Sequence, residues 1–448
     1  METRLHFDQA LLPGGWADDV AVRIRGGRIA SLTVNAAPDP AAERHGIALP
    51  GIPNLHSHAF QRALAGLTAR RGDSEDSFWT WREAMYRFVD RLDPDGVAAI
   101  AALAYVEMLE AGFTRVGEFH YLHHGPDGAP YGDRAEMAAA IARAVGETGI
   151  ALTLLPVFYA RSGFGGAPAG AGQRRFANDI DGFAELLEGA RRHLDRLPDA
   201  VLGVAPHSLR AVTPEELSMV AGLSEGPIHI HIAEQVREVE DCVAWSGARP
   251  VEWLMANQPV DARWCLVHAT HMTDAETDAL ARSGAVAGLC PVTEADLGDG
   301  IFPAERYFTG GGRFGIGTDS NVRVDAAGEL RLLEYGQRLS QRRRNVLADA
   351  GTSTGARLVT DAIAGGAQAL GAVAALREGA PADIVTLPAD APDFVARAGD
   401  ALLDSFVFGR GALDCVWRAG VKQVESGRHR ARDAVAVRYR AAVERVLA

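Results

Sequence analysis

Short apolar runs alternate with amphipathic helical patterns over most of the chain, from about residue 51 to about residue 350. Between the runs, apolar residues recur with a helical period over 92–111, 134–148, 174–194, 213–223 and 273–283. The eight runs have the length of buried strands and read IALPGIPNLH, TRVGEFH, ALTLLPVFY, AVLGVAPHS, PIHIHIA, RWCLVHA, AVAGLC and RFGIGTDS. Eight strands separated by helices predict an α/β fold, a parallel (β/α)8 barrel of the TIM type.

Both ends of the chain have a β pattern instead. The N-terminal segment contains DDVAVRIRGGRIASLTV, and the C-terminal segment contains REGAPADIVTLP and LDCVWRAGVKQVESGRH. We therefore expect a small β-sandwich domain built from both termini, residues 1–50 and 371–448, around a barrel of residues 51–370.

Two predicted loops are longer than an ordinary connection between a strand and a helix. Residues 60–91, after the first strand, contain FWTWREAMYRF, and residues 291–312, after the seventh, contain PVTEADLGDGIFPAERYFTGGG. Long loops at the carboxyl ends of barrel strands are where such folds build their active sites.

Five polar side chains lie at the ends of predicted barrel strands. His56 and His58 end the first strand at positions i and i+2, a spacing that points both imidazoles to the same face. His231 ends the fifth strand, His268 the sixth and Asp319 the eighth. Three imidazoles and one carboxylate suit a catalytic zinc, and Fe²⁺ or another divalent metal suits them almost as well. The pattern predicts a metal site at the catalytic face of the barrel.

Charge and composition narrow the possible partners. The net charge is −13 without a basic block, so we expect no nucleic-acid partner. No apolar run has the length of a membrane span and no signal peptide is evident, so we expect a cytoplasmic protein. An anionic substrate would need a local arginine cluster, because the overall charge repels it.

The motifs of this constellation resemble those of the amidohydrolase superfamily over the whole chain, including the terminal β segments. His231-Ile-Ala-Glu234 is similar to the fifth-strand HxxE motif of the deaminase branch, in which the histidine binds metal and the glutamate shuttles protons. The resemblance implies one Zn²⁺ per subunit, held by His56, His58, His231 and Asp319.

Many members of the superfamily hold two metals bridged by a carbamylated lysine on a barrel strand. The only lysine of this chain, Lys422, lies outside the predicted barrel, which excludes that arrangement. A pair bridged by a carboxylate, with Glu118 as the candidate, remains an alternative.

The resemblance also implies hydrolysis of a C–N bond. Asp319 would act as general base, Glu234 would deliver a proton to the departing nitrogen, and His268 would stabilise the oxygen or orient the attack.

Longer segments resemble the branch of the superfamily that hydrolyses the formimino group of a small dicarboxylate. They include PGIPNLHSHAFQRALAGL, FWTWREAMYRF, APHSLRAV and TEADLGDGIFPA. Arginine forks suit the two carboxylates of such a substrate. The chain departs from the branch pattern at Asp296 and Asn321, where asparagine and histidine are common. By resemblance, the residues that contact the substrate are Gln61, Arg82, Tyr121, His207 and Arg210.

Two alternatives remain open at this point. A deaminase of guanine or adenosine type would use the same scaffold with aromatic stacking in place of the arginine pair. A non-catalytic scaffold protein would lack metal ligands, whereas this chain has all four. A homodimer is the expected assembly, because it is common among similar proteins.

Overall fold

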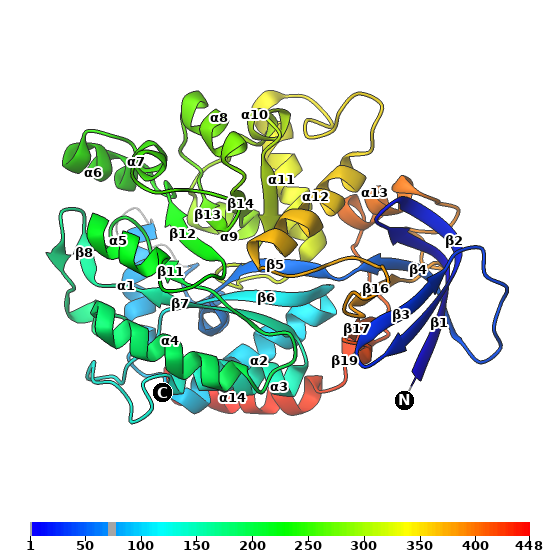
Figure 1. Cartoon of the computed structure of the whole chain (residues 1–448), viewed down its shortest axis with the longest axis horizontal. Helices are drawn as coiled ribbons and strands as arrows, with labels where there is room; N and C mark the ends of the chain where they lie inside the picture. Colours follow the sequence, from blue (N-terminus) through cyan, green and yellow to red (C-terminus); the bar gives the residue numbers. More distant parts are fainter. Residues whose placement is uncertain (1, 70–77) are drawn as a thin grey trace.

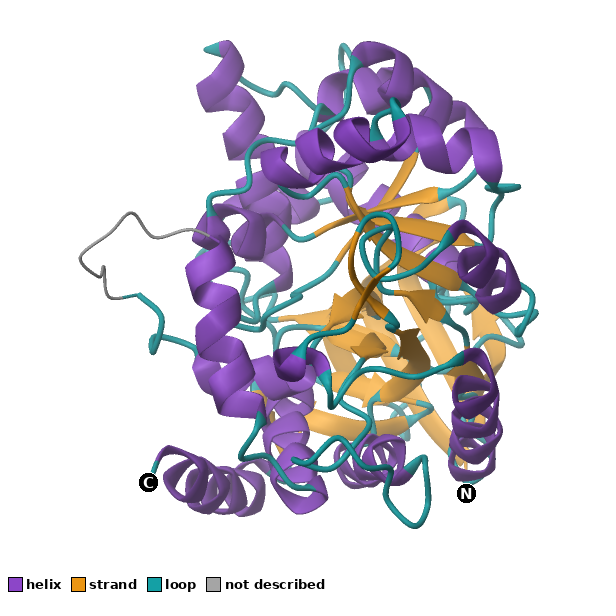
Figure 2. Cartoon of the chain, turned by 90° about the vertical axis from the view of Figure 1, so that its left-hand side faces the viewer, coloured by secondary structure: helices purple, strands orange, loops and turns teal. Residues whose placement is uncertain are grey.

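The computed structural model describes residues 2–69 and 78–448, so residues 70–77 of the first long loop lie outside the described residues. A ring of strands surrounded by helices forms the larger part, and a β domain lies beside it (Figures 1 and 2). All eight apolar runs are barrel strands, namely β5 (Ile52–Ser57), β6 (Phe113–His120), β7 (Ala151–Phe158), the split pair β10 (Val201–Leu202) and β11 (Ala205–Pro206), β12 (Ile228–Ile232), β13 (Trp264–His268), β14 (Val286–Leu289) and β15 (Arg313–Ile316).

Backbone pairs close these strands into a ring. Strands β5, β6, β7, β10 and β11 form one parallel group, and β12, β13, β14 and β15 form another. Bridges from Val204 to Ile228 and from Ser208 to His231 join the two groups on one side, and a bridge from Ser57 to Asp319 joins them on the other. The predicted (β/α)8 barrel is confirmed.

Gly317 allows the eighth strand to end against the first. A Cβ at this position would lie 2.8 Å from the Cβ and carbonyl oxygen of His56. The amides of Thr318 and Asp319 both donate to that same oxygen, at 3.1 and 2.9 Å. The absence of a side chain at residue 317 therefore brings Asp319 beside His56 and His58.

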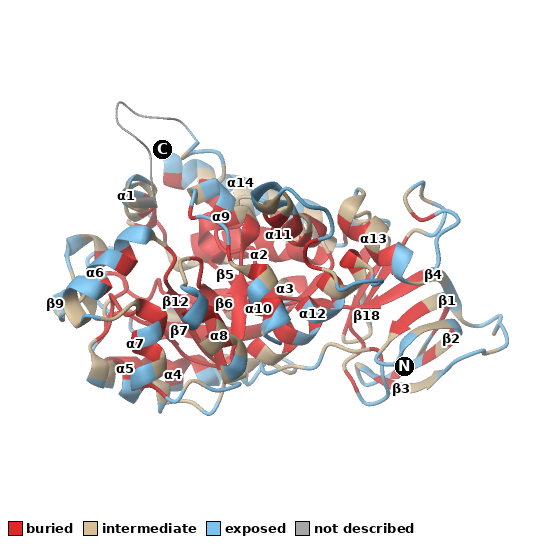
Figure 3. Cartoon of the chain, turned by 90° about the horizontal axis from the view of Figure 1, so that it is seen from above, coloured by how far each residue is buried: buried red, intermediate tan, exposed pale blue. Residues whose placement is uncertain are grey.

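Helices cover the outside of the barrel, and the strands between them are buried (Figure 3). Several begin where an Asp or Thr side chain accepts the amide three residues on, as Asp93, Asp179, Thr213 and Thr273 do. The barrel helices are α1 (Phe78–Val89), α2 (Pro94–Glu110), α3 (Glu136–Thr148), α4 (Ile180–Leu194), α5 (Pro214–Ala221), α6 (Val236–Ser246), α7 (Pro250–Asn257), α8 (Asp274–Ser283), α9 (Pro291–Leu297), α10 (Ala304–Thr309), α11 (Ala326–Gln341) and α12 (Thr354–Ala369).

The long loops are partly helical. Part of the aromatic segment after β5 is α1, preceded by the 3₁₀ helix η1 (Ala59–Leu64), and the segment after β14 contains α9 and α10. A small hairpin, β8 (Arg161–Gly163) and β9 (Ala167–Pro168), and the 3₁₀ helix η2 (Ala171–Gln173) follow β7. None of the described helices combines the length and apolar character of a membrane-crossing segment.

The β domain takes strands from both ends of the chain, as predicted. Its eight strands form a sheet in the order β19-β18-β17-β16-β4-β1-β2-β3. One apolar core lies within this domain, and Ile47, Leu49, Val385 and Leu387 of its strands pack in the core of the barrel. The strands are β1 (Glu2–Leu12), β2 (Gly15–Arg25), β3 (Arg28–Thr33), β4 (Glu43–Pro50), β16 (Ile384–Leu387), β17 (Val416–Arg418), β18 (Val421–Glu425) and β19 (Arg428–His429).

The C-terminal segment also contains two helices that its β pattern did not predict. Helix α13 (Asp400–Phe408) packs against α11 and α12, and α14 (Arg432–Leu447) packs against α2. Val435, Ala442 and Val446 are the buried residues of α14. These helices attach the last part of the chain to the barrel.

Four buried or half-buried charged side chains join the two parts of the molecule. Arg418, at the end of β17, donates to Asp199 and lies 3.4 Å from Asp383. Arg115 of β6 donates to the other oxygen of Asp199 at 2.9 Å. Asp199 therefore links a barrel arginine to an arginine of the β domain.

Candidate active site

A pocket of about 590 Å³ opens at the carboxyl ends of the barrel strands. All of the site residues predicted from the sequence line it except His56, which lies fully buried below the others. Aromatic side chains that the sequence did not single out complete the wall, among them Tyr86, Tyr159 and Phe176. The predicted site residues therefore come from six different strand ends and meet in one pocket.

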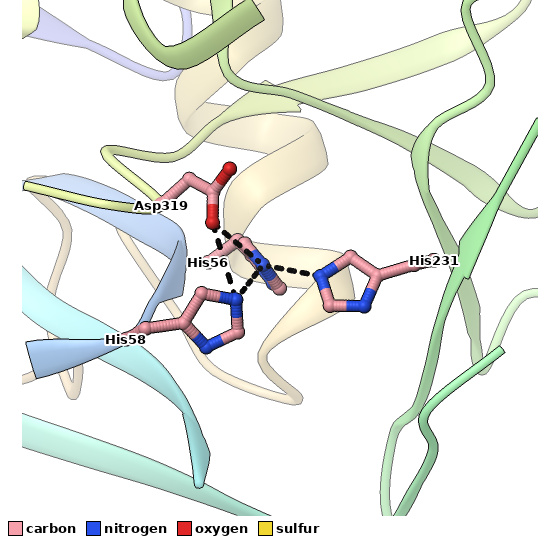
Figure 4. Close-up of side chains that lie close together, drawn as sticks. All are labelled: His56, His58, His231 and Asp319. Carbon is pink, nitrogen blue, oxygen red and sulfur yellow. Dashed lines mark hydrogen bonds and ion pairs between the residues drawn. The ribbon is translucent and has the colours of Figure 1, made fainter. Parts of the chain in front are cut away.

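The four predicted metal ligands meet at one point (Figure 4). One atom of each side chain, His56, His58, His231 and Asp319, lies within 4.8 Å of the others. The Nε2 atom of His56 is 3.2 Å from that of His58 and 3.0 Å from that of His231. The Asp319 Oδ1 atom is 3.2 Å from His58 Nε2 and 3.5 Å from His56 Nε2.

The hydrogen bonds of these imidazoles leave their Nε2 atoms available to bind a cation. His58 Nδ1 donates to the carbonyl of Phe119 at 2.9 Å, and His231 Nδ1 donates to the carbonyl of His207 at 3.2 Å. Their Nε2 atoms therefore carry lone pairs that face the third imidazole, and lone pairs at such distances repel unless a cation lies between them. Burial lowers the pKa of His56 to about 3, so its ring is neutral. Neutral imidazoles and a carboxylate form a site for a divalent metal.

The backbone around the site is strained. Ala233, His268, Asp319 and Asn321 have positive φ angles between 45° and 68°. Residues with a side chain rarely adopt this conformation, and such residues cluster where function requires a fixed geometry. Of these four residues, His268 and Asp319 line the pocket.

Glu234 and His268 lie next to the metal ligands. The Glu234 Oε1 atom is 3.8 Å from His268 Nε2, which is 3.7 Å from Asp319 Oδ2. Burial raises the pKa of Glu234 to about 7, although His268 and Arg210 oppose it. Burial alone would lower the pKa of His268, but Glu234, Glu294 and Asp319 outweigh it and raise it to about 10. Both groups can hold or transfer a proton at neutral pH.

Two arginines face the same pocket. Arg210 is buried and lies 3.8 Å from Glu238, beyond hydrogen-bonding distance. Arg82 stacks on the ring of Trp79 at 4.5 Å. The Nε atoms of both arginines are buried and have no hydrogen-bond partner among the described residues. A buried guanidinium donor without a protein acceptor indicates an anionic ligand.

The other residues predicted to contact the substrate line the same pocket. Gln61 Nε2 donates to the Tyr121 hydroxyl at 2.7 Å, and the Gln61 Oε1 atom has no partner among the described residues. His207 contacts the rings of Tyr159 and His231, and burial holds its pKa well below its ordinary value. The pocket thus combines hydrogen-bonding groups with a neutral imidazole.

Among the described residues, Glu118 is not one of those whose ligand atoms come close enough together to hold a metal. Its Oε1 atom accepts the amide of Ala59 at 2.8 Å, and burial raises its pKa to about 7. A pair of metals bridged by Glu118 therefore has no support from this geometry.

Several supporting residues were missed by sequence reasoning. The Asn321 amide donates to Ser57 Oγ at 3.1 Å and to the His58 carbonyl at 3.2 Å, which ties the turn after β15 to β5. Glu238 accepts the amides of Ala233 and Glu234. The HxxE motif could have led to Glu238, one helical turn further on, but Asn321 carries no local signal of its partners.

Comparison of the sequence with known proteins identifies the family of this chain. Residues 47–420 match the amidohydrolase family, so the chain belongs to that family, and residues 2–46 match the N-terminal domain of formimidoylglutamate deiminase HutF. A curated relative, the formimidoylglutamate deiminase of Pseudomonas aeruginosa, is 52% identical over 429 residues, 94% of each chain. Within the family this chain therefore belongs with the formimidoylglutamate deiminases.

Solved structures share this fold. An amidohydrolase from Brucella melitensis is 55% identical, covers 100% of both chains and superposes with a TM-score of 0.97. An adenosine deaminase from Xanthomonas campestris with bound zinc is 22% identical and has a TM-score of 0.82 over 99% of this chain and 98% of its own. The second likeness shows the shared fold alone.

Proposed function

We propose that this chain hydrolyses N-formimino-L-glutamate to N-formyl-L-glutamate and ammonia, a step of histidine degradation. One observation carries the proposal beyond the 52% identity: Arg82 and Arg210, each with a buried and unpartnered Nε, line the pocket that contains the metal ligands. Two guanidinium groups in one pocket match a substrate with two carboxylates.

We assign the metal as one Zn²⁺ per subunit. Three imidazoles and one carboxylate favour zinc, and the adenosine deaminase from Xanthomonas campestris of the same fold contains zinc. A divalent metal in such a site lowers the pKa of water to ~7, which makes hydroxide available at neutral pH. His56, His58, His231 and Asp319 Oδ1 would hold it.

Proton transfers fall to Asp319 and Glu234. Asp319 Oδ1 faces the imidazoles, whereas Oδ2 faces His268 and is the oxygen that can accept a proton from the attacking water. Glu234, with a pKa near 7, gives a proton to the nitrogen that departs as ammonia. His268 Nε2 faces both carboxylates and stabilises the oxygen that gains charge at the reacting carbon.

The remaining residues position the substrate. Arg82 and Arg210 hold the two carboxylates, so that the formimino carbon lies over Asp319 and Glu234. Gln61, Tyr121 and His207 supply further hydrogen bonds along the same wall. Aromatic rings around them exclude water, which strengthens each charged contact.

The test is the release of ammonia by the zinc-loaded protein from formiminoglutamate, guanine and adenosine. We expect activity on formiminoglutamate alone. The Glu234→Gln variant should keep its metal and lose ~10²–10⁴-fold in kcat, because general acid–base catalysis contributes that much. Activity on guanine or adenosine with none on formiminoglutamate contradicts the proposal, and a purified protein that takes up no zinc supports the scaffold interpretation.

Assembly and location are proposed separately. We propose a homodimer in the cytoplasm, with no nucleic-acid or membrane partner, on the basis of similar proteins and the acidic charge of the chain. Light scattering of the zinc-loaded protein tests the dimer, because a monomer at micromolar concentration contradicts it. Cell fractionation tests the location.

A further inference from the structure

Glu294 lies behind the active site, where the proposed mechanism does not use it. It belongs to the short helix α9, which follows β14, and its side chain is buried. Its Oε1 atom is 3.2 Å from His268 Nδ1, on the opposite side of the imidazole from Glu234 and Asp319. The ring of His268 therefore lies between one carboxylate at its back and two at its front.

The position of the Glu294 carboxylate is fixed by a second bond. The same Oε1 atom accepts the backbone amide of Cys290 at 2.9 Å, and Cys290 directly follows β14. The backbone of Glu294 is held as well, because its amide donates to the Cys290 carbonyl at 2.9 Å and its carbonyl accepts the amide of Asp299. Glu294 is thus anchored to a barrel strand next to β13, which carries His268.

This anchor determines how His268 faces the pocket. A carboxylate accepts but does not donate, so Nδ1 carries the proton in the bond to Glu294. Nε2 is then directed at Glu234 Oε1 and Asp319 Oδ2, at 3.8 and 3.7 Å.

We propose that Glu294 is a positioning residue that binds Nδ1 of His268 and fixes the ring with Nε2 directed toward the reacting oxygen. The inference rests on the proposed function and adds to it a residue without which His268 would be free to turn. Its effect reaches the substrate through His268 alone.

Two substitutions of Glu294 distinguish the effect of its charge from the effect of its hydrogen bonds. Glu294→Gln keeps an oxygen acceptor for both bonds and removes the charge, whereas Glu294→Ala removes both bonds. We expect kcat to fall about 10-fold in the first and about 100-fold in the second, the range measured for groups that orient a site histidine. KM should stay within about threefold, since Glu294 does not line the substrate pocket.

Asp296→Asn is the matched control. It makes the same change from carboxylate to amide two residues along α9, but Asp296 is exposed. Its kcat and KM should equal those of the unmodified protein. Loss of activity in this control as large as in Glu294→Gln would assign the effect to the helix and overturn the proposal.

A double variant distinguishes positioning from a merely structural role. In a His268→Asn background, Glu294→Gln should have no further effect on kcat, because residues that act as a unit are not additive. Additive losses overturn the proposal.

A readout independent of activity examines the bond itself. In protein labelled with ¹⁵N-histidine, we expect an imidazole proton resonance on His268 Nδ1 that is lost in His268→Asn and in Glu294→Ala. If it persists in Glu294→Ala, the proposed bond is absent. If the unmodified zinc-loaded protein does not act on formiminoglutamate, the function fails, and this resonance still decides whether Glu294 holds His268.

Discussion

At the scale of single residues, backbone carbonyls orient the site histidines. The carbonyls of Phe119 and His207 accept from His58 and His231, and that of Ala369 accepts from His229 in the barrel core. Each bond fixes which ring nitrogen carries the proton and leaves the other free. The rings of His58 and His231 are therefore set for a metal by the fold alone.

Arg210→Ala should weaken substrate binding more than it slows the chemical step. A hydrogen bond to a charged group is worth about 1.5–3 kcal/mol, so KM should rise roughly 10- to 150-fold. The rise in KM should exceed the fall in kcat, because a carboxylate remote from the reacting carbon is bound equally in the ground and transition states. Steady-state kinetics on formiminoglutamate provide the measurement.

Arg192→Ala is a suitable control for this experiment. Arg192 lies on α4 with an exposed side chain that pairs with Glu188 at 3.9 Å. Its removal should leave KM unchanged. An unchanged KM in Arg210→Ala itself would remove Arg210 from the substrate site.

Residue identity could be predicted where chemistry requires a particular side chain. His56, His58, His231 and Asp319 are ligand types at strand ends, and the sequence shows both properties. The carbonyl of Phe119 could not be predicted, because any residue supplies the same acceptor. Asn321 was noticed only as a departure from a resemblance, since its partners lie more than 260 positions away in the sequence.

At the scale of elements, α9 and α11 pack together behind the pocket. The carboxyl group of Glu329, in the first turn of α11, accepts the amide of Val292 at 2.9 Å through Oε2, and its other oxygen has no partner among the described residues. Burial raises the pKa of Glu329 well above its ordinary value. The folded protein therefore retains a proton at Glu329 that the unfolded chain releases near pH 4.

Glu329→Gln should make stability less dependent on pH. Because the folded pKa of Glu329 is raised, its contribution is greatest in acid and declines as the pH rises above the unfolded value. Urea denaturation at pH 6 and pH 8.5 should show a larger loss of unfolding free energy in the unmodified protein than in the variant. Equal losses in both would mean that Glu329 is ionised in the folded state.

Elements were predictable where a pattern persists over a buried strand or a full helical face. All eight barrel runs are buried strands, since both faces of a barrel strand are covered. Helix α14 was missed because it buries only Val435, Ala442 and Val446, and alternating valines such as those in AVAV also suit a strand. Packing against α2 decided its conformation.

At the scale of the whole molecule, a buried charged group joins the β domain to the barrel, beside apolar residues of β4 and β16 that pack in the barrel core. Arg418 is 3% exposed and has two carboxylates within reach, Asp199 and Asp383. Arg115 completes the group from the barrel side. The sequence did not predict these pairs, because their members lie up to 219 positions apart and charge alone does not identify partners.

Arg418→Ala should destabilise the folded protein by about 3–5 kcal/mol, because removing one partner leaves buried charge uncompensated. The unfolding free energy from urea denaturation is the measurement. Arg428→Ala is the control, since Arg428 pairs with Asp433 at the surface, where such a pair is worth about 0–1 kcal/mol. Equal effects of the two substitutions would contradict a structural role for the buried group.

The pairing of β4 with β16 has a consequence for folding during synthesis on the ribosome. Strand β4 bonds with β1 on one side and with β16 on the other, and Pro50 lies opposite Ile384. A ribosome adding ~5–20 residues per second needs roughly 20 seconds to a minute to reach that partner. Throughout this time β4 presents an open strand edge, which is a template for aggregation. The nascent chain therefore carries an open edge at β4 until β16 is synthesised, an edge that is paired in the folded protein.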